Sequence, residues 1–295
     1  DAGEVTLADV AGAQLTVTNA ETIGSLNGGG TTGGNVLLTT TLTTGDAGND
    51  TYGGVLSGAG GLTKQGAGAF TLTGANTHTG TTTINAGILE LQGGAAIADA
   101  GEVTLADVAG AQLTVTNSET IGALNGGGGT GGNVAIAAGQ TLTTGDAGND
   151  TYAGIISGAT GALTKQGAGT LILSGANTYG GTTTVSAGTL AVSGATATAG
   201  TGTIAVGANT LDIINAAVVS NAVTINGGTI SNSAGTGTLQ TGGVTLSGTS
   251  NLSSDGTGLT VSAGISGGFG INKNGASTVI LSGTNTHTGT TTINA

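Results

Sequence analysis

The 295-residue chain has no cysteine, proline, methionine or tryptophan, and aromatic residues make up only 2% of it. Without cysteine there is no disulfide framework. With so few rings, a core must be thin and built from Val, Ile, Leu, Ala and Thr. No apolar run approaches the roughly 20 residues that a membrane-spanning helix needs.

Positive charge is nearly absent as well. Three lysines face 15 acidic residues, no arginine is present, and the formal net charge is −12. No basic patch can form, which argues against nucleic acid and anionic membrane surfaces as partners. We also expect no small-molecule substrate.

Glycine is abundant, with 63 residues, and this raises the entropy cost of ordering the backbone. Disorder is nevertheless disfavoured, because the mean hydropathy is +0.27 and the chain is rich in strand-favouring Thr, Val and Ile. Collagen is excluded by the missing proline and the lack of a three-residue glycine period.

The strongest signal in the chain is internal repetition. The segment DAGEVTLADVAGAQLTVTN starts at Asp1 and again at Asp99, and the two copies differ later by short insertions in Gly/Thr-rich stretches. We predict one continuous β-solenoid fragment over 1–295 with repeat units 1–98, 99–199 and 200–295. Because the first residue falls inside a repeat unit, we expect a longer parent chain.

A shorter motif occurs three times, at 58–91, 158–192 and 267–295. Its copies align all three lysines of the chain at one position and an asparagine at another. We predict these to be structural residues of the repeat, with each lysine stem packed over the backbone and its ammonium in water. They are Lys64, Lys165, Lys273, Asn76, Asn177 and Asn285.

Apolar residues alternate with polar ones in runs of four to six, separated by Gly, Asn and Ser. This period of two predicts short strands and turns, without helices. A sandwich has one non-repeating core, whereas repeated units bury their apolar faces against one another. The predicted fold class is therefore all-β, a parallel β-helix or β-solenoid with coils of about 20–25 residues. The threonine rows 81–83, 182–184 and 290–292 are expected to face outward.

The three motif copies resemble the passenger-associated transport repeat of bacterial autotransporters. The second copy follows the family pattern from Leu163 and Lys165 through Asn177 and Tyr179 to Leu190, whereas the first and third have histidine in place of the tyrosine. The resemblance implies a right-handed β-helix, secreted to the cell surface by a C-terminal outer-membrane translocator barrel that lies outside this fragment. In that family such repeats are associated with secretion and folding of the passenger.

The repeated segment GDAGNDTY, at 45–52 and 145–152, approaches the glycine/aspartate nonapeptide that binds calcium in toxins. Calcium needs six to eight oxygen ligands, and isolated copies supply too few. We therefore expect hydrogen-bonding turns and no cofactor, and keep calcium as a weak alternative. Its candidate ligands are Asp46, Asp50, Asp146 and Asp150.

Other ionisable residues are read as surface groups. His78 and His287 occupy the position of Tyr179, so we expect exposed turn residues rather than ligands or catalysts. The acidic pairs Glu4/Asp9 and Glu102/Asp107 could flank a sugar, as glycoside hydrolysis requires. They recur in both repeats, which favours solvated faces and no enzyme activity. Ice binding by the threonine rows is a weaker alternative.

The leading hypothesis is a non-enzymatic extracellular stalk, the passenger of an autotransporter-like surface protein, with adhesion as a candidate function. The expected partners are the translocator barrel, a second copy of the chain, or a host or surface ligand. The alternative is a self-assembling filament, sheath or surface-layer subunit, since the ends of a solenoid expose unpaired strand edges.

Overall fold

The structure, a computed structural model, describes residues 3–294. This part of the chain consists of short strands, turns and bends, and none of it forms a helix that could span a membrane. The fold divides into two compact units, each described by itself. Unit 1 contains residues 3–144 and 153–155, and unit 2 contains residues 145–152 and 156–294.

Four sheets run through unit 1, and each receives at most one strand from every circuit of the backbone. The first contains β1 (Glu4–Leu7), β4 (Ser25–Gly28), β7 (Asp50–Tyr52), β10 (Ala69–Leu72), β12 (Ile88–Leu91), β14 (Gln112–Val115) and β17 (Asn133–Ile136). The second contains β3 (Glu21–Thr22), β6 (Leu42–Thr44), β9 (Leu62–Lys64), β11 (Thr82–Ile84), β13 (Glu102–Leu105) and β16 (Ala123–Gly126). The smaller two contain β2 (Gln14–Val17), β5 (Asn35–Leu38) and β8 (Leu56–Ser57), and β15 (Glu119–Thr120) and β18 (Thr141–Thr144).

Unit 2 has the same construction. One sheet contains β19 (Asp150–Tyr152), β22 (Thr170–Leu173), β24 (Thr189–Ser193), β26 (Thr210–Ile214), β29 (Thr229–Asn232), β32 (Ser250–Ser254), β35 (Ile271–Asn274) and β37 (Thr291–Ile293). A second contains β21 (Ala162–Lys165), β23 (Thr183–Val185), β25 (Ile204–Val206), β28 (Val223–Ile225), β31 (Val244–Leu246) and β34 (Ile265–Gly267). The remaining strands are β20 (Ile156–Ser157), β27 (Ala217–Val219), β30 (Thr236–Leu239), β33 (Gly258–Val261) and β36 (Val279–Leu281).

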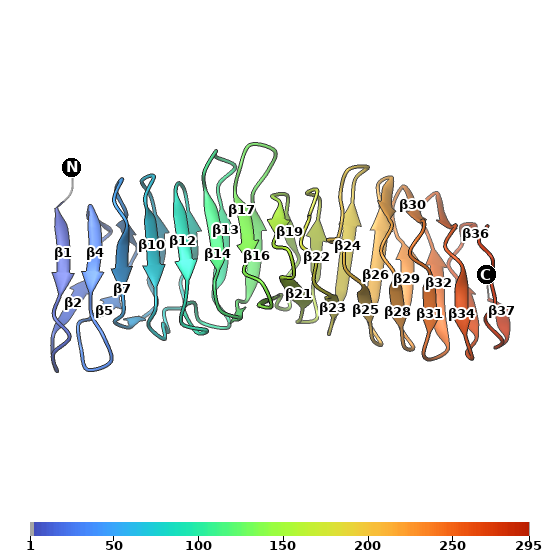
Figure 1. The fold of residues 1–295 in the computed structure, drawn as a ribbon, viewed down its shortest axis with the longest axis horizontal. Coiled ribbons are helices and arrows are strands. Elements are labelled where there is room, and N and C mark those ends of the chain that lie inside the picture. The colour runs from blue at the N-terminus through green and yellow to red at the C-terminus, as the bar shows by residue number, and fades with distance from the viewer. Residues whose placement is uncertain (1–2, 295) are drawn as a thin grey trace. The chain divides into compact units, whose positions relative to one another are not determined.

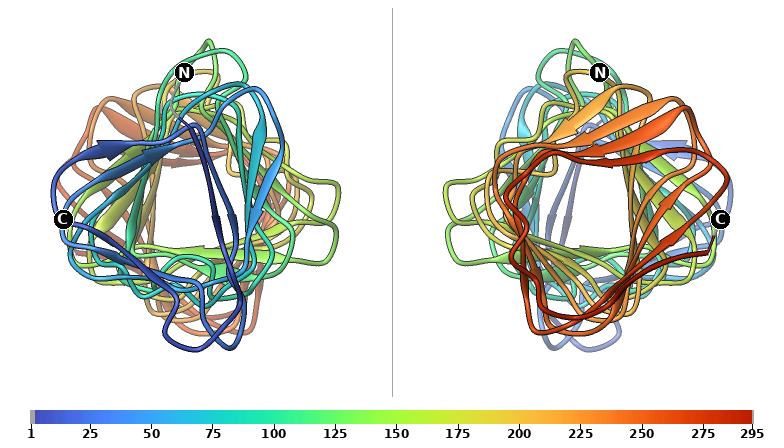
Figure 2. Two further views of the ribbon diagram at one scale, coloured as in Figure 1. Left: turned by 90° about the vertical axis from the view of Figure 1, so that its left-hand side faces the viewer. Right: turned by 90° about the vertical axis from the view of Figure 1, so that its right-hand side faces the viewer.

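Within each unit the backbone winds in coils, and each strand pairs in parallel with its equivalent one coil later. Phe70 lies opposite Leu89, 19 residues on, and Gly28 lies opposite Tyr52, 24 residues on. Figure 1 shows neighbouring strands side by side within each unit, and Figure 2 looks into the coils from either end. The predicted parallel β-solenoid is confirmed, whereas the repeat boundaries 1–98, 99–199 and 200–295 stay a prediction.

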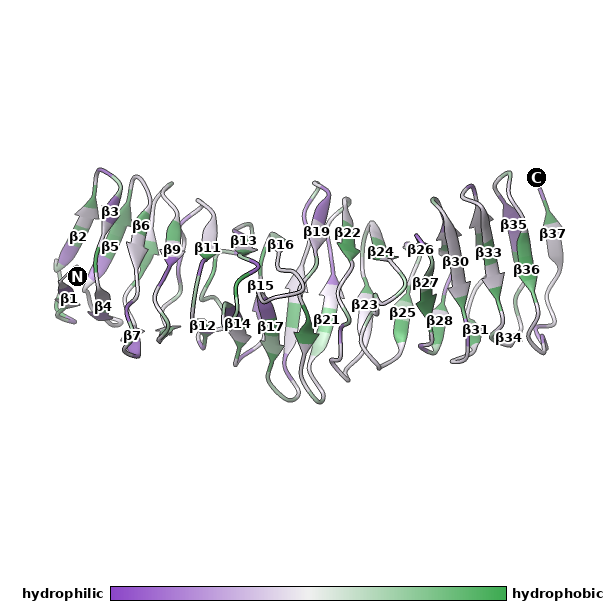
Figure 3. Ribbon diagram, turned by 90° about the horizontal axis from the view of Figure 1, so that it is seen from above, coloured by the Kyte–Doolittle hydropathy of each residue, from purple (hydrophilic) through white to green (hydrophobic). Residues whose placement is uncertain are grey.

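The core consists of ladders of aliphatic side chains that point into the coils. In unit 1 one such ladder runs through Leu42, Leu62, Thr82, Val103 and Leu124, all fully buried. Figure 3 shows apolar segments on short strands such as β22 and β36 rather than in one long run. The period of two in the sequence is thus the alternation between this interior and the outer surface.

The expectation that the threonine rows face outward is wrong for the middle residue of the first two rows. Thr82 and Thr183 are fully buried, because strand alternation turns them inward. Their neighbours Thr83 and Thr184 do face outward. In unit 1, Thr83 belongs to an outer ladder in which threonines from four successive coils lie opposite one another, namely Thr43, Thr63, Thr83 and Thr104.

Adjacent residues of β11 allow a direct test of this inside–outside alternation. Ile84 is fully buried between Lys64 and Leu105, so Ile84→Ala should lower the free energy of unfolding by about 2–5 kcal/mol. The measurement is chemical denaturation followed by circular dichroism. Thr83→Ala, on the outer face of the same strand, should change the stability by less than about 0.5 kcal/mol. Equal effects of the two substitutions would contradict the assigned orientation.

Candidate functional site: the buried polar positions of the repeat

The lysines of the first two motif copies are buried, which corrects the expectation that their ammonium groups lie in water. Only 1% of Lys64 is exposed, and its Nζ donates to the carbonyl oxygens of Gln65 at 2.6 Å, Gly66 at 2.8 Å and Ala86 at 3.1 Å. Ala86 lies one coil further on. The ammonium therefore joins backbone oxygens of two coils instead of contacting solvent.

Lys165 repeats this arrangement in unit 2. Its Nζ donates to the carbonyl oxygens of Gln166, Gly167 and Ala187 at 2.6, 2.9 and 3.3 Å. A lysine ammonium has three donors, so three carbonyls can satisfy it fully. The recurrence of one geometry at two places explains why the few lysines of the chain share one motif position.

Burial and nearby acids shift the pKa of these ammonium groups in opposite directions. Burial lowers the pKa of Lys64 to about 8, and the negative charges of Asp50 and then Asp46 oppose that shift. Burial likewise lowers the pKa of Lys165, again opposed by the corresponding aspartates of its unit, Asp150 and then Asp146. The aspartates of the GDAGNDTY segment thus favour the charged form of the lysine on the next coil.

The same segment provides the space in which the lysine lies. Gly45 has a φ of +115°, and a Cβ there would lie 2.2 Å from the oxygen of Gln65 and 3.0 Å from Cδ of Lys64. A larger residue would collide with the next coil. Gly145, with a φ of +119°, is placed in the same way against Lys165.

Two side chains of this segment, Asp50 and Tyr52, bond to the preceding coil, and Asp46 bonds within its own turn. Asp46 accepts a bond from the backbone N–H of Gly48 at 2.6 Å, and Asp50 accepts one from Nδ2 of Asn27 at 2.9 Å. Tyr52 donates its hydroxyl to the oxygen of Gly34 at 2.7 Å.

The groups that surround these acids bear on whether they could bind calcium. Within residues 3–294 no group of three or more acidic or histidine side chains is arranged to hold a metal ion. Asp46 and Asp50 bond to protein donors and lie in the field of a lysine ammonium. The expectation of no cofactor, with calcium at Asp46, Asp50, Asp146 and Asp150 as the weak alternative, stays a prediction.

The motif asparagines link three successive coils. Asn76 is 3% exposed, accepts a bond from the backbone N–H of Leu56 at 2.7 Å and donates Nδ2 to the oxygen of Ala96 at 2.8 Å. Asn177 bonds in the same way to Ile156 and Thr198, at 2.8 and 2.6 Å. One amide therefore satisfies an N–H of the coil before and a carbonyl of the coil after.

The third motif copy has the same residues in more open surroundings. Lys273 is half-buried and donates to the oxygen of Gly275 at 2.5 Å. Asn285 is exposed and accepts a bond from the N–H of Ile265 at 3.0 Å. The bond of the asparagine to the preceding coil is thus common to all three copies.

The histidine and tyrosine position of the motif is buried as well, so the expectation of exposed turn residues is wrong. His78 and Tyr179 are each 0% exposed, and His287 is half-buried. Each ring bonds to a threonine four residues later in the chain. Its partners are Thr82 for His78 at 3.0 Å, Thr183 for Tyr179 at 2.7 Å and Thr291 for His287 at 3.0 Å.

The acidic pairs considered for glycoside hydrolysis have separate structural partners. Glu4 accepts bonds from Thr6 and Asn27, whereas Asp9 accepts the backbone N–H groups of Thr32 and Gly33 at 2.8 Å each. Asp107 repeats the Asp9 contact with Thr130 and Gly131. These aspartates hold glycine-rich loops of the next coil. Their recurrence at one repeat position was the available sign of that role.

Sequence reasoning missed the most deeply buried acid, Glu119. It is 2% exposed, and Oε1 accepts a bond from the N–H of Ile97 at 2.8 Å, while Oε2 has no partner within residues 3–294. Burial raises the pKa of this carboxyl, and the charge of Asp99 adds to the shift. The backbone N–H groups of Ile97 and Ala96 oppose it.

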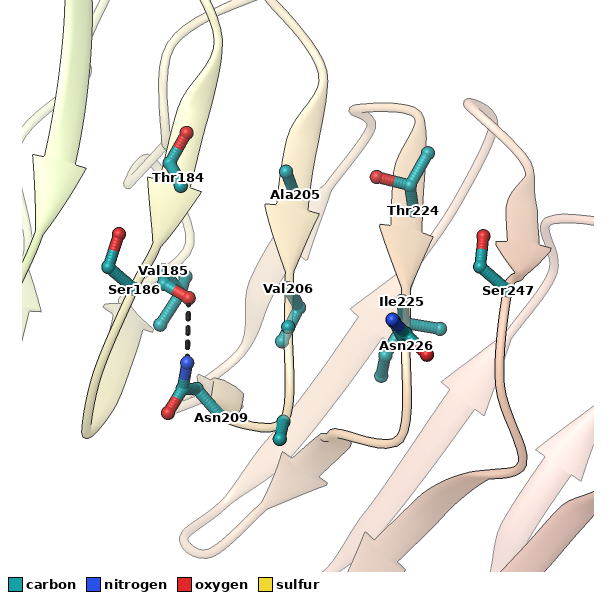
Figure 4. A pocket seen from close by; sticks show the side chains of 12 residues that line it. Thr184, Val185, Ser186, Ala205, Val206, Asn209, Thr224, Ile225, Asn226 and Ser247 are labelled. Carbon is teal, nitrogen blue, oxygen red and sulfur yellow. Dashed lines mark hydrogen bonds between the residues drawn. The ribbon is translucent and has the colours of Figure 1, made fainter.

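Unit 2 carries a shallow groove along the outer edge of β23, β25 and β28 (Figure 4). It contains no charged side chain, and its floor includes Val206 and Ile225. Asn209 donates Nδ2 to the oxygen of Val185 at 2.9 Å. The hydroxyls of Thr184, Ser186, Thr224 and Ser247 form no hydrogen bond to other residues of the described part. This surface therefore presents hydroxyl and amide groups over small apolar side chains.

These features define a repeat-built parallel β-solenoid whose motif residues bond one coil to the next. A family model described as the passenger-associated-transport-repeat matches residues 62–91, 163–192 and 271–295. Each of these three segments is thus similar to that repeat, and the resemblance seen in the sequence is confirmed.

The chain is also similar to a named protein, "Adhesin BmaC autotransporter" from Brucella suis biovar 1 (strain 1330). The two are 34% identical over 311 residues, a match that covers 96% of this chain and 8% of that relative. The chain therefore spans a small part of the length of the curated relative it matches. No solved structure matches the chain.

The buried lysine can be tested by removing its charge while keeping its length. Lys64→Met leaves three backbone carbonyls without their donor, so the free energy of unfolding should fall by about 1–3 kcal/mol. Denaturant titration measures the change. Lys273→Met, at the more open copy of the position, is the matched control and should cost less. A Lys64→Met variant as stable as the native protein would contradict a structural role of the ammonium.

From the burial of Glu119 we expect the stability of the protein to depend on pH. Its pKa in the folded state lies above the unfolded value of 4.5, so the native state loses stability as pH rises through and above 4.5. Glu119→Gln should therefore be more stable than the native protein at pH 7, by about 1.4 kcal/mol per unit of pKa displacement. The difference should shrink toward pH 4.5. Thermal melts across this range measure it.

The control is Glu21→Gln, because Glu21 holds the same repeat position but is exposed. At pH 7 it should change the stability by less than about 0.5 kcal/mol, because an exposed side chain contributes little. A Glu119→Gln variant less stable than the native protein at pH 7 would contradict the assignment of a destabilising buried charge.

Proposed function

We propose that the chain is a non-enzymatic segment of an autotransporter passenger, presented at the bacterial surface and used for adhesion. The observation that carries the proposal is the similarity of 96% of the chain to an autotransporter adhesin, together with three passenger-associated transport repeats. Because the match covers 8% of that relative, the activity of the whole relative enters only as part of this proposal.

The use of the reactive side chains supports a non-enzymatic role. Catalysis needs a base, acid or nucleophile that can reach a substrate. The ammonium groups of Lys64 and Lys165 are bonded to backbone oxygens, and His78 is fully buried. The two lysines therefore join coils, and the imidazole of His78 lies in the interior of its coil, where a substrate cannot reach it.

The outer surface supports a role in contact with a partner. It carries ladders of threonine and the uncharged groove of unit 2, and small polar groups of this kind can hydrogen-bond to a ligand without first breaking internal bonds. A host or surface ligand is the partner that this proposal requires. For export, the proposed partner is an outer-membrane translocator domain.

The alternative of a filament, sheath or surface-layer subunit is not favoured by the match to an adhesin. Association of two copies through strand edges would give rise to assembly independent of any host ligand.

Surface display tests export and adhesion separately. We expect the chain, fused to an autotransporter translocator domain in a Gram-negative host, to be cleaved by protease added to intact cells. We also expect these cells to bind to cultured host cells more than cells that display the translocator alone. A fused segment of equal composition and scrambled sequence controls for unfolded polypeptide. Export without binding above both controls would overturn adhesion, and failure of export would overturn the passenger assignment.

A further inference from the structure

The first motif copy buries an imidazole that only one hydrogen bond satisfies. His78 is 0% exposed, and its Nε2 lies 3.0 Å from Oγ1 of Thr82. Nδ1 is buried and has no partner within residues 3–294. A neutral imidazole can tolerate this, because one nitrogen then carries no proton. A protonated ring has two N–H donors, and the second would be buried without an acceptor.

The second motif copy shows how the same position is filled without a group that titrates near neutral pH. Tyr179 is equally buried and bonds to Thr183 at 2.7 Å, as His78 bonds to Thr82. The hydroxyl of Thr183 in turn donates to the oxygen of Ala199 at 3.0 Å. Burial raises the pKa of Tyr179 above its ordinary value, so the phenol stays neutral over the whole physiological range.

No neighbouring charge is bonded to His78 to compensate a proton on its ring. The ionisable groups on its own coil and on the coils around it are Asp46, Asp50, Tyr52, Lys64, Glu90, Asp99, Glu102 and Glu119. None of them hydrogen-bonds to the imidazole in the described part of the chain. Burial alone displaces the pKa of His78, downward from 6.5.

We propose that His78 is an acid-sensitive element of unit 1, and that protonation of its ring loosens the coil that contains residues 74–84. The coil of unit 2 that contains Tyr179 lacks this element. Acid would therefore open one repeat of the solenoid while the equivalent repeat stays closed. This inference rests on the packing of the motif and is independent of the proposed adhesion.

The direction follows from proton linkage. Near and below pH 6.5 the unfolded or opened coil binds a proton at His78 more readily than the closed coil does. The closed state is fully stable above pH 6.5 and loses stability as pH falls below it. One proton taken up on opening increases the opening equilibrium constant by about tenfold per pH unit, until the closed state also binds the proton.

Local opening can be measured by hydrogen exchange at matched amides of the two repeats. Thr77 and Thr79 donate to the oxygens of Leu56 and Gly58 at 2.8 and 2.9 Å. Thr178 and Gly180 donate to Ile156 and Gly158 at 2.8 Å each. After correction for intrinsic exchange rates, protection at Thr77 and Thr79 should fall by up to about fivefold between pH 6.5 and 5.5. Protection at the two amides of unit 2 should stay constant.

Two substitutions assign the effect to the ring. His78→Gln removes the titrating group and should abolish the acid-dependent loss of protection at Thr77 and Thr79. Tyr179→His should transfer that loss to Thr178 and Gly180, since Thr183 is retained as the partner. Unchanged acid dependence in His78→Gln, or none in the native protein, would overturn the proposal.

A measurement without substitution near the site keeps the test valid if these variants fold poorly. The chain has two histidines, so its imidazole resonances can be assigned with a His287→Gln variant. We expect the resonance of His78 to titrate below pH 6.5. Titration of His78 at or above 6.5 would overturn the proposal, whatever its amides show.

Discussion

The structure depends on the rule that buried backbone donors and acceptors must be bonded. Strand ladders satisfy this rule where successive coils run in parallel, but each coil also turns several times, and there the ladder stops. Side chains take over at these corners. Asn76 serves an N–H of one neighbouring coil and a carbonyl of the other, and Lys64 gathers three carbonyls. The polar motif thus completes a hydrogen-bond network that the strands alone leave open.

The residues that stabilise the solenoid therefore differ from the residues on its outer surface that could contact a partner. The ammonium groups of Lys64 and Lys165 and the ring of His78 point into or across the coils, and the outer surface keeps threonine, serine, asparagine and exposed acids such as Glu21. Substitutions in the outer ladder of Thr63 and Thr83 touch no buried bond, whereas Gly45 cannot change without collision with the lysine of the next coil. A fold of this kind can vary its surface freely while its corners stay constant.

The sequence was sufficient to predict the coils, because repeats and a period of two both follow from stacking in register. It also aligned Lys64 and Asn76 with their counterparts in the other motif copies, and their role as structural residues stays a prediction. It did not predict that Lys64, His78 and Thr82 face inward, because hydropathy assigns polar side chains to water. The carbonyls of Gln65 and Gly66 converge on the ammonium only in the folded chain. No sequence pattern predicts that geometry. Glu119 was missed because its local sequence is nearly the same as that of Glu21, so nothing in the sequence separates the buried glutamate from the exposed one.

The difference between Glu21 and Glu119 indicates which contacts contribute to the free energy of unfolding. Glu21 and Glu119 share their local sequence, and so do Asn76 and Asn285, yet one member of each pair is buried and the other exposed. Local sequence is therefore not what decides their energetics. Asn76 is bonded to the coil before it and to the coil after it, so its contribution to stability belongs to the interfaces between coils rather than to the coil itself. A motif residue therefore stabilises the contact between neighbouring coils. Its contribution to the free energy of unfolding exists only when both coils are present.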